Sequence, residues 1–401
     1  MKVVHINTFP GGGAGIAATR LHEGLLNCNV HSSFVCISDN QVNISNATFL
    51  RFKSPTRWQR IVNKFVKPIF AEHLKEHLIA KYNPVCEFLG TPYSDYSIES
   101  LPVVREADII NLHWIPSIIN YPSFFKNIRK PIVWTMHDLS AFMGCFNYPI
   151  EQINNPNMET IDKMYYAKKI EALKEYKNII NIVGPSKWII EKAKTYQPFA
   201  KLQFHHIPYG INTNLLSYKD KTLARKKLGL EEDKYIFLFV SEHIENKRKQ
   251  FVKILQLARE FLGNDRISFV AIGEGNNTDD SNNITFVGKI NSLENLNLYY
   301  SAADYFLMPS LEDNFPNVVL EALFCGTPVI SNNVGGMKDI INDSNGFLAN
   351  DFDVKTIYDW INRQLSIKDN YNRQKISEFT KERYAIENMV NAYLKIYNSI
   401  I

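Results

Sequence analysis

A short stretch around residue 310 constrains the fold of this chain more than any other. Residues 305–308 form an apolar run typical of a strand, residues 309–317 form a polar and acidic turn, and residues 317–324 carry helical spacing. A strand that leads through a loop into a helix places the N-terminus of that helix at the carboxyl edge of a parallel sheet. Free backbone N–H groups and the positive end of the helix dipole meet there, so the stretch predicts a binding site for phosphate.

Two carboxylates, Asp313 and Glu321, frame this turn. Carboxylates are poor partners for phosphate but accept hydrogen bonds from sugar hydroxyls. A phosphate site with hydroxyl acceptors beside it indicates a nucleotide sugar as the ligand. The same residues are also compatible with an ordinary strand–loop–helix unit that carries acids on its surface.

The stretch resembles the signature of retaining glycosyltransferases of family four. That signature has an acid, an aromatic residue two positions later, a second acid eight positions after the first, then Ala and Gly-x-Pro-Val. The matching residues here are Asp313, Phe315, Glu321, Ala322 and Gly326 to Val329. The family usually has Glu at the first acidic position, whereas this chain has the shorter Asp313 with Glu312 just before it. Either Asp313 or Glu312 therefore takes the role of the first acid.

Length and composition fit two globular domains. The chain has 401 residues, of which 45% are hydrophobic and 21% are charged, and this is enough material for two cores. The formal net charge of +4 is mild, so we expect no nucleic-acid partner. The five cysteines are scattered without a C-x-x-C pair, which is typical of reduced thiols in a cytoplasmic protein. We find neither the apolar region of a signal peptide nor a run long enough to span a membrane.

The first half opens with a strand (residues 2–7), a glycine turn (11–15) and a helix (16–26). Glycine lets backbone N–H groups approach an anion closely. Residues 13–18 also fit the loose dinucleotide pattern G-x-G-x-x-A, and Asp39 lies where a ribose-binding acid would stand. An oxidoreductase that binds NAD or FAD at Gly13, Gly15 and Asp39 is therefore the alternative function. In the family that the chain resembles, a Gly-Gly-Ala turn matched here by Gly12, Gly13 and Ala14 lines the cleft against the donor phosphate and the acceptor.

Residues 51–81 are rich in lysine and arginine. On a helix over residues 57–69, an aromatic and aliphatic side would face away from a basic side until Pro68 interrupts it. This pattern is typical of a helix that lies on a membrane surface, and equally of a solvated face over an ordinary core stripe. The first interpretation would place the protein at the inner face of the membrane.

Residues 73–77 spell H-x-x-E-H, which puts His73 and His77 one helical turn apart beside Glu76, as in one class of zinc peptidase. Zinc needs a further protein ligand, and no partner segment stands out. Two surface histidines are the other interpretation. The strands expected to line the cleft contain no D-x-D cluster that would carry a metal with a diphosphate, so we expect neither a metal nor a cofactor apart from the donor substrate.

Two buried strands, at residues 108–114 and 131–138, end in polar residues that should point into the ligand crevice of an open α/β sheet. His137 is the stronger candidate because Asp138 follows directly. Residues 135–145 resemble the acceptor-side loop of the family, in which the histidine lies beside the donor sugar and has a role in catalysis or sugar positioning. His113 is compatible with a function or with a structural hydrogen bond.

Basic residues precede a predicted helix at residue 251 and reinforce the attraction of its N-terminus for pyrophosphate. The family has an arginine shortly after the strand and a lysine that opens the helix. Lys249 matches the lysine, whereas Glu242 stands at the arginine position, so we assign the arginine role to Arg248. Residues 269–275 and 284–290 are further strands, the first leading into a turn at Gly273. In the family the end of the second strand, here Ile290, contacts the nucleotide base through its backbone.

The resemblance covers the whole chain and implies the GT-B fold, in which two doubly wound, parallel-sheet, Rossmann-like α/β domains face each other across a cleft. The alternation of strand and helix signals supports such domains independently. We expect an N-terminal acceptor-side domain at residues 1–205, a nucleotide-sugar domain at 206–382 and a terminal helix at 383–401 that crosses back. A binding-only protein of the same fold, without transfer activity, is the remaining alternative.

The resemblance also implies the reaction and the site. A retaining hexosyltransferase would move a sugar from a UDP- or GDP-sugar to a glycan or lipid-linked glycan in surface polysaccharide biosynthesis. Arg248 and Lys249 would hold the diphosphate, and Glu321 would accept from the ribose hydroxyls. Asp313 or Glu312 would hold the donor sugar with His137 beside it. The backbone that assists at the phosphates belongs to Phe315, Pro316, Asn317 and Val318.

Overall fold

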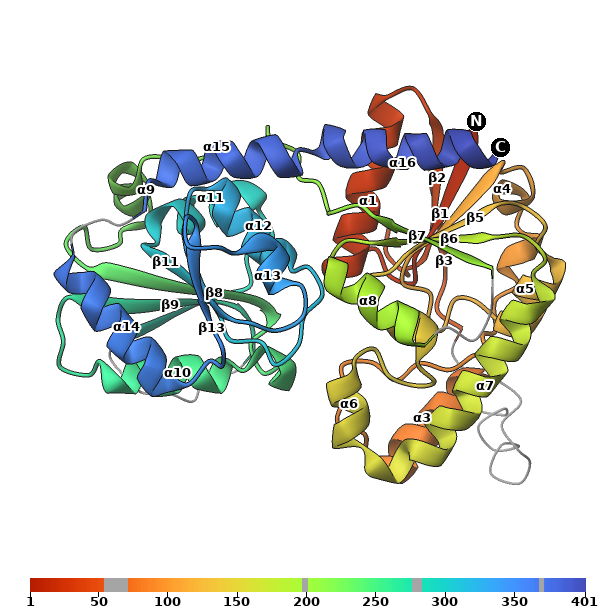
Figure 1. Ribbon diagram of the computed structural model, residues 1–401, viewed down its shortest axis with the longest axis horizontal. Coiled ribbons are helices and arrows are strands. Elements are labelled where there is room, and N and C mark those ends of the chain that lie inside the picture. Colours follow the sequence, from red (N-terminus) through yellow and green to blue (C-terminus); the bar gives the residue numbers. More distant parts are fainter. Residues whose placement is uncertain (54–70, 197–200, 276–282, 368–370) are drawn as a thin grey trace. The chain divides into compact units, whose positions relative to one another are not determined.

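The computed structural model describes residues 1–53, 71–196, 201–275, 283–367 and 371–401 (Figure 1). The basic segment at residues 57–69 lies outside these ranges. The chain divides into two compact units, Met1–Pro208 with Met389–Ile401 and Tyr209–Asn388. We refer to them as the N-terminal and C-terminal domains.

The N-terminal domain contains a seven-stranded sheet in the order β3-β2-β1-β4-β5-β6-β7, in which all paired strands are parallel. Its strands are β1 (Lys2–Ile6), β2 (His31–Ile37), β3 (Ala47–Leu50), β4 (Ile109–Leu112), β5 (Ile132–Thr135), β6 (Ile180–Gly184) and β7 (Leu202–His206). The order runs outward in both directions from the β1–β4 pair. Ligands in such sheets bind beyond the carboxyl ends of the strands at this switch point.

The helices of this domain are α1 (Gly12–Asn27), α3 (Ala71–Tyr82), α4 (Pro102–Arg105), α5 (Tyr121–Asn127), α6 (Pro149–Asn154), α7 (Glu159–Glu175), α8 (Lys187–Thr195) and most of α16 (Ile386–Ile400). Helix α1 begins at Gly12, so residues 12–15 are its first turn and not a separate glycine loop, which corrects the sequence prediction. A Cβ at Gly15 would lie 2.6 Å from the carbonyl carbon of Pro10, so the helix can begin this close to the preceding loop only with glycine there.

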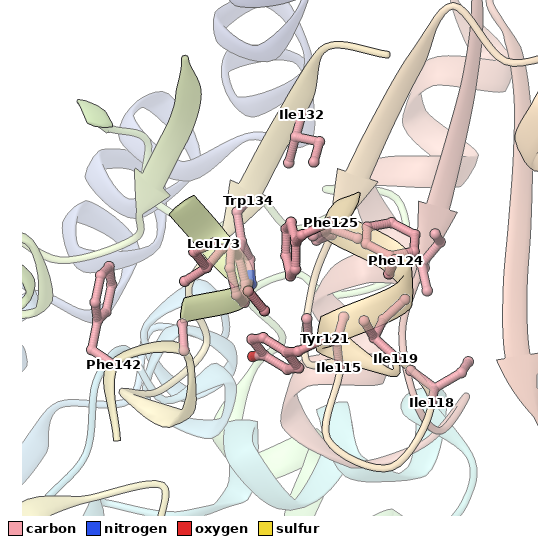
Figure 2. Packing of buried hydrophobic residues seen from close by; sticks show 14 of the residues in the cluster. Ile115, Ile118, Ile119, Tyr121, Phe124, Phe125, Ile132, Trp134, Phe142 and Leu173 are labelled. Carbon is pink, nitrogen blue, oxygen red and sulfur yellow. The ribbon is translucent and has the colours of Figure 1, made fainter. Parts of the chain in front are cut away.

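The main core of the N-terminal domain lies on one face of its sheet. Strand side chains alternate between the two faces, and Ile110, Leu112, Ile132 and Trp134 face this core. Figure 2 shows Trp134 of β5 among the aromatic residues of α5 and near Leu173 of α7. The alternate residues of the same strands therefore face the opposite side of the sheet, and this side carries polar side chains.

The C-terminal domain contains a six-stranded parallel sheet in the order β10-β9-β8-β11-β12-β13. Its strands are β8 (Tyr235–His243), β9 (Ile267–Glu274), β10 (Ile284–Gly288), β11 (Tyr305–Met308), β12 (Val329–Asn332) and β13 (Gly346–Ala349). Its helices are α9 (Lys221–Leu228), α10 (Phe251–Glu260), α11 (Leu293–Ala302), α12 (Asn317–Phe324), α13 (Met337–Ile340), α14 (Val354–Ser366) and α15 (Arg373–Tyr384). Helices α10 and α14 cover one face of the sheet, and α11 and α12 cover the other (Figure 1).

The predicted fold class, two doubly wound parallel-sheet α/β domains, is confirmed by these two sheets. Both have the strand order of a dinucleotide-type fold, and in the C-terminal domain the switch point lies between β8 and β11. Within the described residues, no helix combines the length and the apolar composition needed to cross a membrane.

Candidate functional site

Two cations and one carboxylate meet at the switch point of the C-terminal sheet. Arg248 and Lys249 belong to a short 3₁₀ helix (Lys247–Lys249) between β8 and α10, and Asp313 belongs to the loop between β11 and α12. Lys249 Nζ donates to Asp313 Oδ2 at 2.5 Å, and Arg248 Nη1 donates to the same oxygen at 3.1 Å. The three side chains are between 9% and 18% exposed, so water screens the cluster only weakly.

The two cations determine the charge state of Asp313. Burial on its own raises the pKa of the Asp313 carboxyl, but the attraction of Lys249 and Arg248 and their hydrogen bonds outweigh burial, so the pKa lies below its ordinary value. Asp313 is therefore ionised at neutral pH. One carboxylate offsets one of the two cations, and the cluster keeps a net positive charge.

Asp313 and its neighbour Glu312 take different positions in this cluster. The carboxylate of Asp313 faces the cations, whereas Glu312 accepts from Arg248 Nη1 through its backbone carbonyl oxygen at 2.6 Å. The backbone N–H of Leu311 also donates to the carbonyl of Arg248 at 2.8 Å. These contacts join the loop after β8 to the loop after β11.

The loop of Asp313 is held from a third side by the turn after β12. The N–H of Gly336 donates to the carbonyl oxygen of Asp313 at 3.0 Å. Gly335 has a φ of +56°, and a Cβ built on it would lie 1.6 Å from that same oxygen. Asn332 Nδ2 donates to the carbonyl of Ser310 at 2.8 Å. Only glycine fits at position 335 because the backbone of Asp313 occupies the space of its side chain.

Glu321 lies inside α12, one turn after the helix begins, and is buried. Tyr300 of α11 donates its hydroxyl to Glu321 Oε2 at 3.1 Å, which fixes the orientation of the carboxylate. Pro316 precedes the first residue of α12, Asn317, and no side chain caps this helix. The ring of Phe315 packs edge-on against Tyr209 and Tyr384, which anchors the loop before α12.

The remaining predicted residues of this domain lie at the ends of β9 and β10. Gly273 is the last but one residue of β9, where a Cβ would lie 2.4 Å from the carbonyl oxygen of Ser241 on β8. Ile290 follows β10 by two residues and is half-buried. Val318 is half-buried on the first turn of α12. All these positions belong to the carboxyl ends of the strands or to the segments that follow them.

In the N-terminal domain, His137 follows β5 and is buried against a second histidine. His137 Nε2 lies 3.0 Å from His113 Nδ1, and burial lowers the pKa of His137 to about 3, so its imidazole is neutral. Asp138 lies beside it, and burial raises the pKa of that carboxyl to about 6. Gly12 and Gly13 lie in the first turn of α1.

The structure also places the residues considered for an oxidoreductase, Asp39, and for a zinc site, His73, Glu76 and His77. Asp39 accepts a hydrogen bond from the backbone N–H of Phe52 at 3.0 Å. In α3, His73 is buried while His77 and Glu76 are exposed, so the pair neither shares an exposed face nor consists of two surface histidines. Within the described residues, no group of three His, Cys, Asp or Glu side chains could hold a metal ion.

Sequence reasoning missed several partners of the predicted residues. Tyr300, which bonds Glu321, sits at a helical position with no distinguishing pattern. The role of Gly335 against Asp313 could have been sought in the Val334-Gly335-Gly336 turn, because paired glycines after a strand signal a close backbone approach. The contact between His113 and His137 needed the pairing of β4 with β5.

Comparison with known proteins finds a family match within the C-terminal domain. Residues 220–383 match the family described as "Glycosyl transferases group 1". An uncharacterized glycosyltransferase of Methanocaldococcus jannaschii is 26% identical over 318 residues, which cover 73% of this chain and 76% of that protein. Two other curated relatives are matched over only 34% of their own length.

Solved structures share the fold over the whole chain. HepE of Anabaena, crystallised with UDP and glucose, is 14% identical and superposes with a TM-score of 0.68 over 100% of both chains. WaaG, a glycosyltransferase involved in lipopolysaccharide biosynthesis, is 16% identical with a TM-score of 0.63 over 99% of both chains. These likenesses confirm the GT-B fold, and the group 1 domain confirms the predicted enzyme class, a glycosyltransferase.

Proposed function

We propose that the protein is a retaining, metal-independent glycosyltransferase that moves a sugar from a nucleoside-diphosphate sugar to a glycan or lipid-linked glycan acceptor. The group 1 domain and the HepE structure with UDP and glucose support a nucleotide-sugar donor. The likeness to WaaG, named for lipopolysaccharide biosynthesis, supports an acceptor that belongs to a surface polysaccharide.

The observation that carries the proposal is the pairing of Arg248 and Lys249 with the buried Asp313 at the C-terminal switch point. Transfer of a sugar requires that a diphosphate leaves while positive charge develops on the sugar ring. Fixed cations in a site that water screens weakly stabilise the departing diphosphate, and one such group typically contributes about 2.7–4 kcal/mol to the transition state. Arg248 and Lys249 are already oriented by Asp313, so little reorganisation is needed when the donor binds.

In this proposal the two acids bind the parts of the donor other than the diphosphate. Glu321, held by Tyr300, accepts from the ribose hydroxyls. Asp313 takes the role of the first acid of the signature, because its carboxylate faces the cations while Glu312 uses its backbone there. The backbone of the first turn of α12 assists at the phosphates. His137 contributes to the sugar side of the reaction from the N-terminal domain.

Metal independence follows in this proposal from the two cations. A divalent ion in other nucleotide enzymes neutralises the diphosphate, and here Arg248 and Lys249 can do so. No metal is then needed with the donor, and EDTA should leave turnover unchanged. A strict requirement for Mg²⁺ or Mn²⁺ would contradict this part of the proposal.

Thermal unfolding with candidate ligands tests the donor class. The melting temperature is measured with UDP, GDP, ADP and NAD, each with Mg²⁺ or with EDTA, because a ligand that binds the native state stabilises it by mass action. We expect a rise with UDP or GDP that EDTA does not remove. A rise with NAD alone would instead support the oxidoreductase alternative at Gly13, Gly15 and Asp39, which the group 1 match disfavours.

A transfer assay separates the enzyme from a binding-only protein. Once the nucleotide is known, release of the nucleoside diphosphate from the matching sugar donors identifies the sugar, and the anomeric signal of the product in the NMR spectrum gives the stereochemistry. We expect the product to keep the configuration of the donor. Binding without any transfer to a lipid-linked acceptor pool would favour the binding-only alternative.

A further inference from the structure

Three histidines form a row on the polar face of the N-terminal sheet. His5 on β1, His113 after β4 and His137 after β5 occupy alternate positions to the core residues of their strands. His5 Nδ1 lies 2.9 Å from His113 Nε2, and His113 Nδ1 lies 3.0 Å from His137 Nε2. The ring centroids are 5.2 and 5.3 Å apart and the ring planes differ by 30° and 24°, so neighbouring rings lie edge to edge. Each imidazole therefore uses a ring nitrogen to bond the next one.

The row is buried and uncharged. His5, His113 and His137 are at most 9% exposed, and burial lowers the pKa of all three imidazoles below the ordinary value. A neutral imidazole carries one proton, on Nδ1 or on Nε2, so each contact in the row needs a donor nitrogen facing an acceptor nitrogen. The tautomers of the three rings are consequently coupled, and fixing one of them fixes the others.

Asn111 fixes the direction of the row. Its Nδ2 lies 2.9 Å from His113 Nε2 and 3.2 Å from the carbonyl oxygen of Leu112. Because the Leu112 carbonyl can only accept, the atom of the Asn111 amide that faces it must be the nitrogen. The amide oxygen of Asn111 accepts from the hydroxyl of Tyr397 on α16 at 2.7 Å, which agrees with this orientation. The amide nitrogen of Asn111 also donates to Thr135 Oγ1 at 3.1 Å, and an amide nitrogen cannot accept a hydrogen bond. A proton on His113 Nε2 would therefore set two donor nitrogens against each other at 2.9 Å, whereas a lone pair on Nε2 avoids this repulsion. His113 must carry its proton on Nδ1 and donate it to His137 Nε2.

The far end of the row agrees with this direction. His5 Nδ1 faces the unprotonated His113 Nε2 and must be its donor, which leaves His5 Nε2 as a lone pair. Within the described residues, His5 Nε2 has no hydrogen-bond partner. A buried lone pair without a partner costs less than a buried N–H without one, so the opposite direction would be the more expensive arrangement.

We propose that Asn111 and His113 are positioning residues that hold His137 as the neutral Nδ1–H tautomer. His137 then serves the reaction as a hydrogen-bond donor through Nδ1, directed at an oxygen of the sugar or phosphate, and does not act as a general base. The catalytic part of this inference rests on the proposed glycosyltransferase function. The tautomer part does not, because it follows from the hydrogen bonds of the N-terminal domain alone.

The tautomer can be measured directly on the full chain. The protein is labelled with ¹⁵N-histidine, and two-bond ¹H–¹⁵N correlation spectra at pH 7 distinguish protonated from unprotonated ring nitrogens in each of the 10 histidines. The signals that disappear in His137→Gln belong to His137. We expect a protonated Nδ1 and an unprotonated Nε2. A protonated Nε2 on His137 in the wild-type protein would overturn the proposal without any further variant.

Two substitutions of His113 distinguish the effect of its hydrogen bond to His137 from the effect of losing the imidazole ring. His113→Leu removes the donor, and we expect the Nε2–H tautomer of His137 to appear. His113→Asn keeps an amide nitrogen near the position of Nδ1, and we expect the Nδ1–H tautomer to persist. His22→Gln controls for packing alone, because His22 is equally buried and packs edge-on against His5 but forms its hydrogen bonds with Ser32 and the Ser45 carbonyl. A His137 tautomer that is unchanged in His113→Leu would contradict the positioning role.

Turnover of the nucleotide sugar provides the second readout. The loss of one hydrogen bond that positions His137 should lower kcat/KM about 10-fold in His113→Leu, with a smaller loss in His113→Asn. Equal losses in both variants would contradict control through the tautomer. If the wild-type protein turned over no nucleotide sugar, the proposed function would fail, whereas the spectra would still decide the tautomer.

Discussion

Lys249 Nζ lies 2.5 Å from Asp313 Oδ2 although 64 residues separate the two in the chain. The parallel sheet explains the contact, because β8 and β11 are neighbours and their carboxyl ends open at the same edge. The segment after β8 carries Arg248 and Lys249, and the segment after β11 carries Asp313. This one edge therefore collects the charges that a nucleoside diphosphate needs.

Asp313→Asn should destabilise the C-terminal domain at neutral pH. The substitution keeps the size of the side chain but leaves Arg248 and Lys249 without their buried counter-charge, and we expect a loss of about 2 kcal/mol in the free energy of unfolding. Equilibrium urea unfolding of both proteins measures the loss. Glu312→Gln removes the neighbouring charge but keeps the backbone carbonyl that accepts from Arg248, and we expect it to cost less stability than Asp313→Asn.

The difference between Asp313→Asn and the wild-type protein should depend on pH. The pKa of Asp313 is lowered in the folded protein, so its stabilising contribution is present above the ordinary pKa of about 3.9 and is lost as the pH falls through the folded value. The stability gap should therefore be constant from pH 7 to 5 and close below pH 4. A gap that persists unchanged in strong acid would mean that the charge of Asp313 is not its source.

Gly335→Ala should abolish donor turnover. Its Cβ would overlap the carbonyl oxygen of Asp313 at 1.6 Å, so the loop that carries the carboxylate has to move. Gly263→Ala is the control, because Gly263 also has a positive φ of +81° but no atom lies within 4 Å of its Cβ. The control should cost about 1 kcal/mol of stability and leave kcat/KM unchanged. Equal kinetic effects of the two substitutions would contradict the role of the Asp313 loop.

Glu321→Gln should raise the KM for the nucleotide sugar and lower turnover, because one oxygen of the carboxylate is replaced by a donor that cannot accept from the ribose hydroxyls. Tyr300→Phe removes only the hydroxyl that orients Glu321, and we expect a weaker effect in the same direction. Steady-state kinetics with the donor varied measures both. A near-wild-type KM in Glu321→Gln would refute the ribose role.

The N-terminal domain should lose stability between pH 7 and 5. His5, His113 and His137 stay neutral in the folded protein, whereas in the unfolded chain they bind protons below their ordinary pKa of about 6.5. Stability is therefore full above that value and falls by up to about 1.4 kcal/mol per pH unit for each histidine as the pH decreases. Asp138, whose pKa burial raises to about 6, works in the opposite direction but is a single group.

Tryptophan fluorescence during urea unfolding measures this dependence, because four of the five tryptophans precede residue 209. His137→Gln removes one of the linked protons, so its stability should depend less steeply on pH than that of the wild-type protein. The same slope in both proteins would show that His137 does not stay neutral in the folded state.

The sequence predicted the elements around the donor site closely. The strand at 305–308 and the helix at 317–324 coincide with β11 and α12, because a short apolar run, a polar turn and a helical period follow each other without overlap. The glycine turn near the N-terminus was predicted as a loop, whereas α1 begins at Gly12. Glycine is a poor indicator there, since the close approach to Pro10 that requires Gly15 is a tertiary contact.

The side-chain partners were harder to predict than the elements. The sequence left the first acid open between Asp313 and Glu312, since both precede the same helix and only the loop conformation decides which carboxylate faces the cations. It also left His113 open, because its contact with His137 depends on the pairing of β4 with β5. Hydrogen bonds between the ends of strands that are distant in the chain produce no regular residue spacing, so a single sequence does not reveal them.

Calorimetric titration of UDP and GDP in the presence of EDTA tests the central claim most directly. It is carried out on the wild-type protein, on Lys249→Ala, and on Lys247→Ala, which removes the same charge from an exposed position in the same 3₁₀ helix. We predict that one of the two nucleotides binds the wild-type protein and the Lys247→Ala control alike, and that Lys249→Ala weakens it about 30-fold, or roughly 2 kcal/mol. No binding of either nucleotide, or equal affinities in the two lysine variants, would contradict a diphosphate site at Arg248, Lys249 and Asp313.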